Sequence, residues 1–543
     1  MGPRWTIGWL LAACAPEPPS PEEAGLGPVE QLVRVSMGLR GVRPSATEIR
    51  AVAAEPDLIG VYADAWLRDP LFGETIREIH DHAWRMSTDI VQLPASGSLA
   101  GAPMARIKAG VLGGPARLAE HVVTNDLPYT ETVTGDWFVA DGIAAAAWPD
   151  VEGYDSELPD DVWQVVRWGD GRPLAGVLSD SGLWLRYRSP NANYNRTRAN
   201  ALSRALLCHD FLEVATEAVD ASVDLSNLAA AENAIATVPG CVACHQDLDG
   251  LAGFLPFEPF WPVPSMVFPY GVYDPDDEDQ WREMTGRPPV YFGEPGDGLA
   301  DLGRAIAADP RFAECAARRF YGWFAQMRPA DVPTYVAIEL HDVLVDSGFD
   351  ARQMARAAIL SPELAAAGTL VATPRQLARM VEALTGFRWE VDVTTTCCDA
   401  SAGSSPYGLV DLSTDQYVGF DVVGGGYDGD GVLDPKRAPS TTGAAFQQRL
   451  AERAAAYVVE EDFHGIAPKL LTNVDVATTD EMSIRKQLVE LHATILAELL
   501  EMEDPEIDRS YDLWADTYER TDVKQAWRVV LTAMLRDFRV ATY

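Results

Sequence analysis

Apolar residues recur at helical spacing along most of this chain, and the runs begin and end with helix-capping residues. Ser45 and Glu48 form a capping-box signature ahead of one such run. Asp309 followed by a proline predicts a second helix start. A third helix is expected to begin after Thr373 and to end at Gly386. Two further amphipathic runs cover residues 484–501 and 523–538.

Two segments interrupt this pattern. Residues 256–298 are rich in proline, glycine and aromatic residues, and residues 394–439 contain two glycine-rich stretches. Both are expected to be irregular. Helices packed on helices are therefore the predicted architecture, a mainly α, multi-helical fold with a few short strands.

The length of 543 residues exceeds what one hydrophobic core normally supports, so several domains are expected. We predict an N-terminal segment, an N-terminal helical domain, a small irregular middle segment and a C-terminal helical domain, over residues 1–28, 29–230, 231–330 and 331–543.

The chain carries a formal charge of −38, which disfavours binding to nucleic acid and to anionic lipid headgroups. No apolar run reaches the roughly 18 to 20 residues that a membrane-spanning helix needs. No catalytic residue is assigned, because the common hydrolase and nucleotide-binding motifs are absent from the sequence.

The N-terminus resembles a bacterial lipoprotein signal. Arg4 gives a basic start, residues 7–13 are apolar, and small residues precede Cys14. That resemblance implies that Cys14 carries the lipid, and Ala15 after it favours the outer membrane. The proline-rich stretch that follows is typical of a tether. An unprocessed N-terminal segment is the alternative.

The most informative motif is Cys241-Val-Ala-Cys244-His245. Cys-x-x-Cys-His is the spacing at which a chain carries covalent haem c, with both thiols bonded to the porphyrin and the histidine bound to iron. With 7 Cys and 8 His in the chain, its chance occurrence is about one in a thousand. The alternatives are a redox or structural disulfide and, less favoured, a metal site without haem.

The sequence leaves the second axial ligand of such an iron open. The candidates are His209, Met266, Met284 and Met327, each of which is also an ordinary packing residue. Aromatic residues after the motif could form a haem wall, or the segment could pack on its own aromatics; they are Phe254, Phe257, Phe260 and Trp261.

Four other cysteines remain. Cys208 and Cys315 could pair in an oxidising compartment or stay as two buried thiols. Cys397 and Cys398 are adjacent, and their roles stay open.

Two further motifs were considered as metal sites. His80 and His82 point to nearly opposite faces of a helix, so a surface helix is preferred over a shared metal. Residues 428–434 have the alternating acid and glycine of a calcium loop but lack its glutamate, which makes calcium a less favoured cofactor.

Several blocks in order resemble the planctomycete-type cytochrome c domain family, large secreted bacterial proteins of unknown role. The blocks are residues 126–137, 176–178, 193–196, 207–208, 241–249 and 312–315. The resemblance implies haem on Cys241 and Cys244 with His245 as iron ligand. Asp249-Gly250 departs from the expected Asp-Pro, and residues after about 370 have no counterpart.

The leading hypothesis is a lipid-anchored c-type cytochrome in the bacterial cell envelope that passes electrons to an unidentified partner protein. One alternative is a lipoprotein without haem that docks a secreted partner. Another is a haem enzyme such as a peroxidase, which would need an open axial position on the iron.

Overall fold

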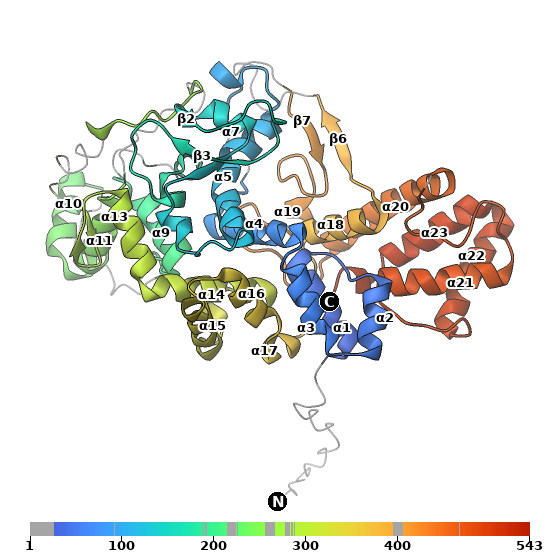
Figure 1. Cartoon of the computed structure of the whole chain (residues 1–543). Coiled ribbons are helices and arrows are strands. Elements are labelled where there is room, and N and C mark those ends of the chain that lie inside the picture. The colour runs from blue at the N-terminus through green and yellow to red at the C-terminus, as the bar shows by residue number, and fades with distance from the viewer. Residues whose placement is uncertain are drawn as a thin grey trace, which may run out of the picture.

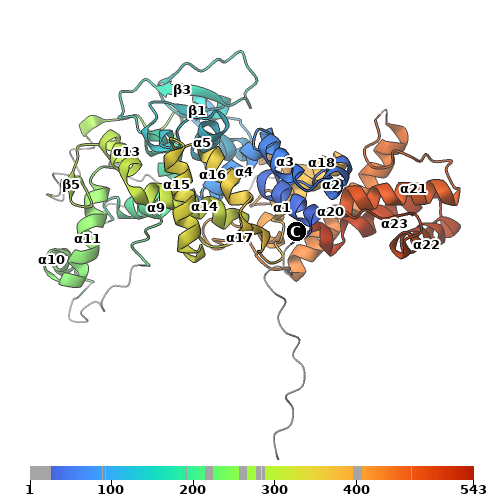
Figure 2. The same cartoon turned by 60° about the horizontal axis from the view of Figure 1, so that its bottom comes forward.

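The computed structural model describes residues 26–543 except 89, 92, 188, 190–192, 214–223, 225, 256–265, 277–282, 284, 285, 287, 395–405 and 466. Helices make up 58% of the chain and the strands are short, which confirms the mainly α, multi-helical fold. In both views the C-terminal helices lie on one side of the molecule and α9 to α11 on the opposite side (Figures 1 and 2).

The first third of the chain forms a helical group with a small sheet. Its helices are α1 (Pro28–Arg40), α2 (Ala46–Ala54), α3 (Leu58–Trp66), α4 (Pro70–Trp84), η1 (Gly97–Leu99), α5 (Met104–Thr124), α6 (Glu131–Thr134) and α7 (Gly142–Ala147). The antiparallel sheet has the order β1-β3-β2, from β1 (Phe138–Ala140), β2 (Val151–Glu152) and β3 (Gln164–Trp168). Phe138 stacks on Trp168 across it, 4.1 Å between ring centroids.

The middle of the chain is a second run of helices with one hairpin. It comprises η2 (Gly176–Ser179), α8 (Ser181–Arg186), α9 (Arg196–Leu207), α10 (Leu228–Thr237), α11 (Pro239–Ala252), β4 (Val290–Tyr291), β5 (Glu294–Pro295), α13 (Leu299–Ala308), α14 (Pro310–Phe324), η4 (Pro329–Asp331), α15 (Thr334–Asp346), α16 (Ala351–Ile359) and α17 (Pro362–Ala365). The hairpin β4–β5 lies inside the segment predicted to be irregular.

The last part begins with α18 (Pro374–Thr385). It continues through β6 (Glu390–Val393), β7 (Gly408–Asp411), α19 (Asp421–Gly424), α20 (Thr441–His464), α21 (Glu481–Leu491), η5 (His492–Leu496), α22 (Pro505–Arg520), α23 (Val523–Leu535) and η6 (Phe538–Val540). The strands β6 and β7 form an antiparallel hairpin.

The capping signals mark helix starts as predicted. The Ser45 and Thr373 hydroxyls accept hydrogen bonds from the backbone three residues on, and Asp309 caps α14. Gly386 ends α18 with a φ of 79°, a left-handed conformation that glycine adopts at no steric cost.

One predicted helix is wrong in its extent. Residues 484–501 were expected to be a single helix, but α21 ends at Leu491 and a π-helical turn follows. The helix ends because of polar contacts: the buried His492 ring contacts Glu498 (3.0 Å) and Ser510 (3.0 Å). These contacts require the chain to turn at Ala497, where φ is 59°.

Two hydrophobic cores organise the described residues. The first extends from α1 to α17, and the helix carrying the Cys-x-x-Cys-His motif contributes Leu248 and Leu251 to it. Apart from Val33 and Met37 of α1, the second begins at Leu377. The change from the first core to the second therefore falls between Leu364 and Leu377. The domain boundaries after residues 230 and 330 stay predictions from the sequence.

Helix α1 belongs to both cores. Leu32, Val35 and Leu39 pack in the first, and Val33 and Met37 pack in the second. The guanidinium of Arg34 also donates hydrogen bonds to three carbonyls in and after α17, at 2.7 to 2.8 Å. One helix therefore links the two halves of the chain.

Candidate functional site

The Cys-x-x-Cys-His motif lies within α11, at the edge of the molecule seen in Figure 1. Pro239 starts this helix. Residues three and four positions apart share a helix face, so Cys241, Cys244 and His245 project to one side. Both thiols are free and partly exposed. The arrangement presents two sulfurs and one imidazole on a single surface.

The second half of α11 anchors the helix. Leu248, Leu251 and Ala252 are buried. Gly250 touches the neighbouring hairpin so closely that a Cβ there would lie 2.5 Å from the carbonyl oxygen of Val290. The motif is therefore carried on the exposed first half of a firmly packed helix.

A carboxylate orients the histidine of the motif. The Nδ1 atom of His245 lies 3.4 Å from Oδ1 of Asp249, whose side chain is 3% exposed. Arg196, at the start of α9, holds the same carboxylate, with Nη2 3.1 Å from Oδ2. When Nδ1–H donates to Asp249, Nε2 becomes the nitrogen with the lone pair, the tautomer that a metal-binding histidine requires.

The environment of Cys244 bears on the disulfide alternative. Burial, followed by the charges of Asp247 and Cys241, raises the pKa of the Cys244 thiol above its usual value. Redox-active cysteines have lowered pKa values, because the thiolate is the reacting form. Cys244 therefore forms its thiolate less readily than an ordinary cysteine.

These residues fit a covalently attached haem in their donor chemistry. Two thiols and an oriented imidazole are the groups that haem c uses. Of the predicted wall residues, Phe254 is buried at 3% exposure. Phe257, Phe260 and Trp261 lie outside the described residues.

The candidates for a second axial ligand are scattered. His245 contacts the start of α9 through Asp249, whereas His209 follows the end of that helix and packs edge-on against Phe211 at 4.6 Å. Burial and the charge of Arg311 lower the pKa of His209. Met266 is buried at 4% exposure. Met327 follows α14, and Met284 lies outside the described residues.

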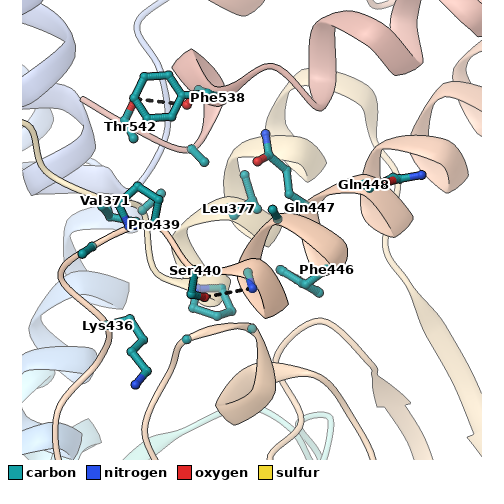
Figure 3. Close-up of a pocket in the computed structure, with 18 of the residues that line it drawn as sticks. Val371, Leu377, Lys436, Pro439, Ser440, Phe446, Gln447, Gln448, Phe538 and Thr542 are labelled. Atoms are coloured by element: carbon teal, nitrogen blue, oxygen red, sulfur yellow. Dashed lines mark hydrogen bonds between the residues drawn. The ribbon is translucent and has the colours of Figure 1, made fainter.

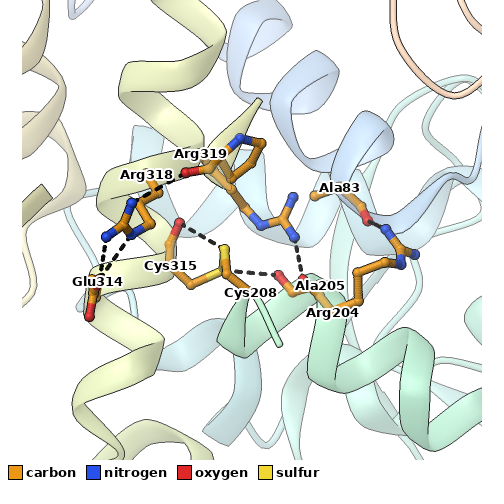
Figure 4. The surroundings of a disulfide bond; sticks show 9 residues. Ala83, Arg204, Ala205, Cys208, Glu314, Cys315, Arg318 and Arg319 are labelled. Atoms are coloured by element: carbon orange, nitrogen blue, oxygen red, sulfur yellow. Dashed lines mark hydrogen bonds and ion pairs between the residues drawn. A yellow bond between two sulfur atoms is a disulfide. The ribbon is translucent and has the colours of Figure 1, made fainter. Parts of the chain in front are cut away.

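Cys208 and Cys315 form a disulfide that joins the end of α9 to α14, with their Cα atoms 5.3 Å apart (Figure 4). This is the pairing considered from the sequence. Cys14, Cys397 and Cys398 lie outside the described residues, so the lipid-anchor prediction is not tested.

The other metal candidates serve structural roles. His80 is buried at 5% exposure, so the expectation of a surface helix is wrong at this position. Its Nδ1 lies 2.7 Å from the carbonyl oxygen of Ile76 and its Nε2 2.9 Å from the Tyr129 hydroxyl. His82 points elsewhere, toward Asp434 at 3.2 Å.

The glycine-rich loop at 428–434 is a turn in this structure. The carboxylate of Asp428 accepts hydrogen bonds from the backbone of Asp430 (2.8 Å) and Val432 (2.7 Å). Within the described residues, no group of three or more His, Cys, Asp or Glu side chains is placed to hold a metal ion.

Two cavities are not predicted by any pattern in the sequence. One, of about 240 Å³, lies where α18, α20 and the C-terminal residues meet, and Leu377, Phe446 and Phe538 line it (Figure 3). The other is an open polar cleft of about 1200 Å³ between α4, α5 and α18. Arg375 in this cleft pairs with Asp81 (3.2 Å) and Asp421 (3.1 Å).

Comparison of the chain with protein-family models, with curated proteins and with solved structures gave no match. Among the described helices, none combines the length and the apolar character needed to cross a bilayer.

Proposed function

We propose that this protein is a c-type cytochrome-like protein of the bacterial cell envelope. Haem would be bonded covalently to Cys241 and Cys244, with His245 as an iron ligand. The observation that supports this proposal is the common face of α11 on which the two free thiols and the oriented imidazole lie. The family resemblance of the sequence points to the same three residues.

In this proposal four residues of α11 and Arg196 of α9 have defined tasks. The thiols of Cys241 and Cys244 hold the group, and His245 offers Nε2 while Asp249 fixes the ring orientation from the other side. Arg196 holds the Asp249 carboxylate in place through an ion pair. When bound, haem supplies reversible one-electron transfer, and no catalytic acid or base is needed for it.

Haem staining after denaturing electrophoresis tests the proposal. The full chain is produced in a bacterial host with a working cytochrome maturation system, because only a covalent adduct keeps its colour under these conditions. We expect a stained band for the wild type and a complete loss of stain for the Cys241→Ser, Cys244→Ser double variant. His464→Ala, on the exposed end of α20, should stain like the wild type.

A colourless wild-type protein from that host overturns the proposal. The remaining hypothesis would then be a lipoprotein without haem that docks a secreted partner. Carbon monoxide binding by the reduced, stained protein would instead indicate an open axial position and the chemistry of a haem enzyme.

The resemblance of the N-terminal residues to a lipoprotein signal supports a second part of the proposal, the location of the protein. We propose that Cys14 is lipidated and anchors the protein, on the outer membrane in particular. The intact mass of the mature protein reports this directly. A Cys14→Ala variant should lose the mass of the lipid and leave the membrane fraction, whereas an unprocessed N-terminus in the wild type would contradict the anchor.

A further inference from the structure

Four arginines gather around the junction of α9 and α14 without a carboxylate partner. Arg85, Arg186, Arg204 and Arg319 form no ion pair among the described residues, although the chain has 81 acidic and 43 basic residues. Arg204 donates to the Ala83 carbonyl (3.1 Å) and the Tyr187 hydroxyl (2.9 Å). Arg186 donates to the Arg85 and Gly429 carbonyls, both at 2.7 Å. The hydrogen bonds of Arg186 and Arg204 therefore go to neutral acceptors, and the charges of Asp210 and Asp434 act on Arg85 without forming an ion pair with it.

The disulfide holds two of these cations together. Arg204 precedes Cys208 by four residues and Arg319 follows Cys315 by four, so each arginine lies about one helical turn from the crosslink. Figure 4 shows Arg319 reaching across to the backbone carbonyl of Arg204. The nearby carboxylate of Glu314 is engaged by Arg318 at 2.8 Å. The crosslink therefore keeps like charges close despite their repulsion.

The burial of the Arg319 guanidinium is the largest energetic cost of this arrangement. Its Nε atom is buried and has no hydrogen-bond acceptor among the described residues. Burial, and then the charge of Arg204, lowers the pKa of the Arg319 guanidinium to about 9. A buried cation without a counterion is destabilising, and an anion bound beside it would offset that cost.

A small cavity of about 40 Å³ opens beside Arg319. His82, Lys436 and Arg437 also line it, together with the polar side chains of Gln326 and Tyr543, and no carboxylate does. Asp434, outside this lining, contacts His82 (3.2 Å) and Arg437 (3.7 Å). This volume accommodates about three water-sized groups, the scale of one tetrahedral oxyanion.

We propose that this cavity, lined by Arg319, His82, Lys436 and Arg437, binds one phosphate group, either as free phosphate or as the end of a small phosphomonoester. Arginine and lysine side chains recognise such an anion through charge-assisted hydrogen bonds. The cavity is too small for a base or a sugar ring, and the charge of −38 repels long polyanions.

Calorimetric titration of the full chain with inorganic phosphate tests the site. The ionic strength is kept constant with chloride, and glycerol 3-phosphate is titrated in parallel to separate free phosphate from an esterified group. We expect saturable binding with a Kd below about 1 mM, because several charge-assisted bonds converge.

Two surface substitutions serve as the main variant. Lys436→Gln with Arg437→Gln should weaken phosphate binding at least about tenfold, since each lost bond is to a charged group. Lys486→Gln removes one exposed charge on the remote α21 and should bind like the wild type. Arg319→Met is a second variant, and its fold is checked by circular dichroism.

The absence of saturable binding by wild type up to about 10 mM phosphate overturns the proposal, because a built site of this charge would be occupied at that concentration. Equal affinities of wild type and the Lys436, Arg437 double variant overturn it as well. The result does not depend on haem, since the haem-free Cys241→Ser, Cys244→Ser protein should bind phosphate equally well.

Discussion

The two ends of α9 differ in whether a carboxylate pairs with their arginine. At its start Arg196 pairs with the buried carboxylate of Asp249 on α11. At its end Arg204 faces Arg319 of α14, and no carboxylate pairs with either of them among the described residues. The first contact is held by attraction. The second is a pair of like charges that depends on the disulfide between Cys208 and Cys315.

A side chain can thus be positioned by an ion pair or by a covalent crosslink between helices. An ion pair holds its partners only while both charges are present, and removing one partner leaves the other buried alone. A covalent bond holds helices together whatever their charges. The start of α9 is therefore sensitive to single substitutions and to charge, and the end of α9 is sensitive to the oxidation of two sulfurs.

The largest expected loss in the free energy of unfolding comes from removing the disulfide. Cys208→Ser with Cys315→Ser opens a link between residues 107 positions apart, and chain-entropy theory assigns such a loop about 4 to 5 kcal/mol. Release of Arg204 and Arg319 would reduce the loss slightly. Urea denaturation followed by tryptophan fluorescence measures it.

The matched control is Cys241→Ser with Cys244→Ser in haem-free protein, which removes two thiols that form no disulfide. Its stability should stay within about 0.5 kcal/mol of the wild type. If the Cys208, Cys315 variant unfolds at the wild-type urea concentration, the crosslink is not what holds the end of α9.

The second-largest expected effect is a pH-dependent change in stability caused by His80, which packs against α14. Burial lowers its pKa to about 4, the bond to the Ile76 carbonyl opposes this, and the charge of Arg319 lowers it further. The unfolded pKa is near 6.5. Since the folded pKa is depressed, this stability is present above pH 6.5 and is lost as the pH falls toward 4.

We expect His80→Gln to lose less stability than the wild type between pH 7.5 and 4.5, by about 2.5 kcal/mol. Denaturation midpoints at several pH values measure the difference. His464→Gln, an exposed histidine at the end of α20, controls for the loss of a histidine as such. Parallel pH profiles for wild type and His80→Gln would contradict the buried, neutral state of this ring.

The smallest effect is expected at the start of α9. Asp249→Ala leaves the Arg196 guanidinium, whose side chain is 16% exposed, without its carboxylate. A loss of about 2 kcal/mol should follow, below the range for fully buried pairs. Thermal denaturation measures it.

Glu490→Ala breaks the exposed pair with Arg50, where the two side chains are 37% and 44% exposed. It should cost no more than about 1 kcal/mol. Equal losses for Asp249→Ala and Glu490→Ala would mean that the contact between α9 and α11 contributes no more than a surface ion pair.

Local chemistry could be predicted from the sequence. Contacts between distant residues could not, apart from the Cys208–Cys315 pairing, which was one of two alternatives. The caps at Ser45, Asp309 and Thr373 depend on side chains within three residues of the helix start. The motif of α11 is contiguous, so its spacing alone defines the candidate site.

No local sequence pattern predicts the arginine cluster. Arg204 and Arg319 are 115 residues apart, and only the packing of α9 on α14 brings them together. Asp81 and Arg375, which meet in the polar cleft, are 294 residues apart. The burial of His80 is not predicted, because the residues that bury it are distant in the sequence: Tyr129 lies in the turn before α6 and Phe320 in α14.

Helix α1 has a consequence for how the chain folds during synthesis. It leaves the ribosome among the first described residues, yet the partners of Val33 and Met37 begin only at Leu377. The apolar strip of Val33 and Met37 can therefore pack only after more than half of the chain has been translated. A fragment that ends before α18 would keep that strip exposed to solvent, and it should self-associate more strongly than the full chain.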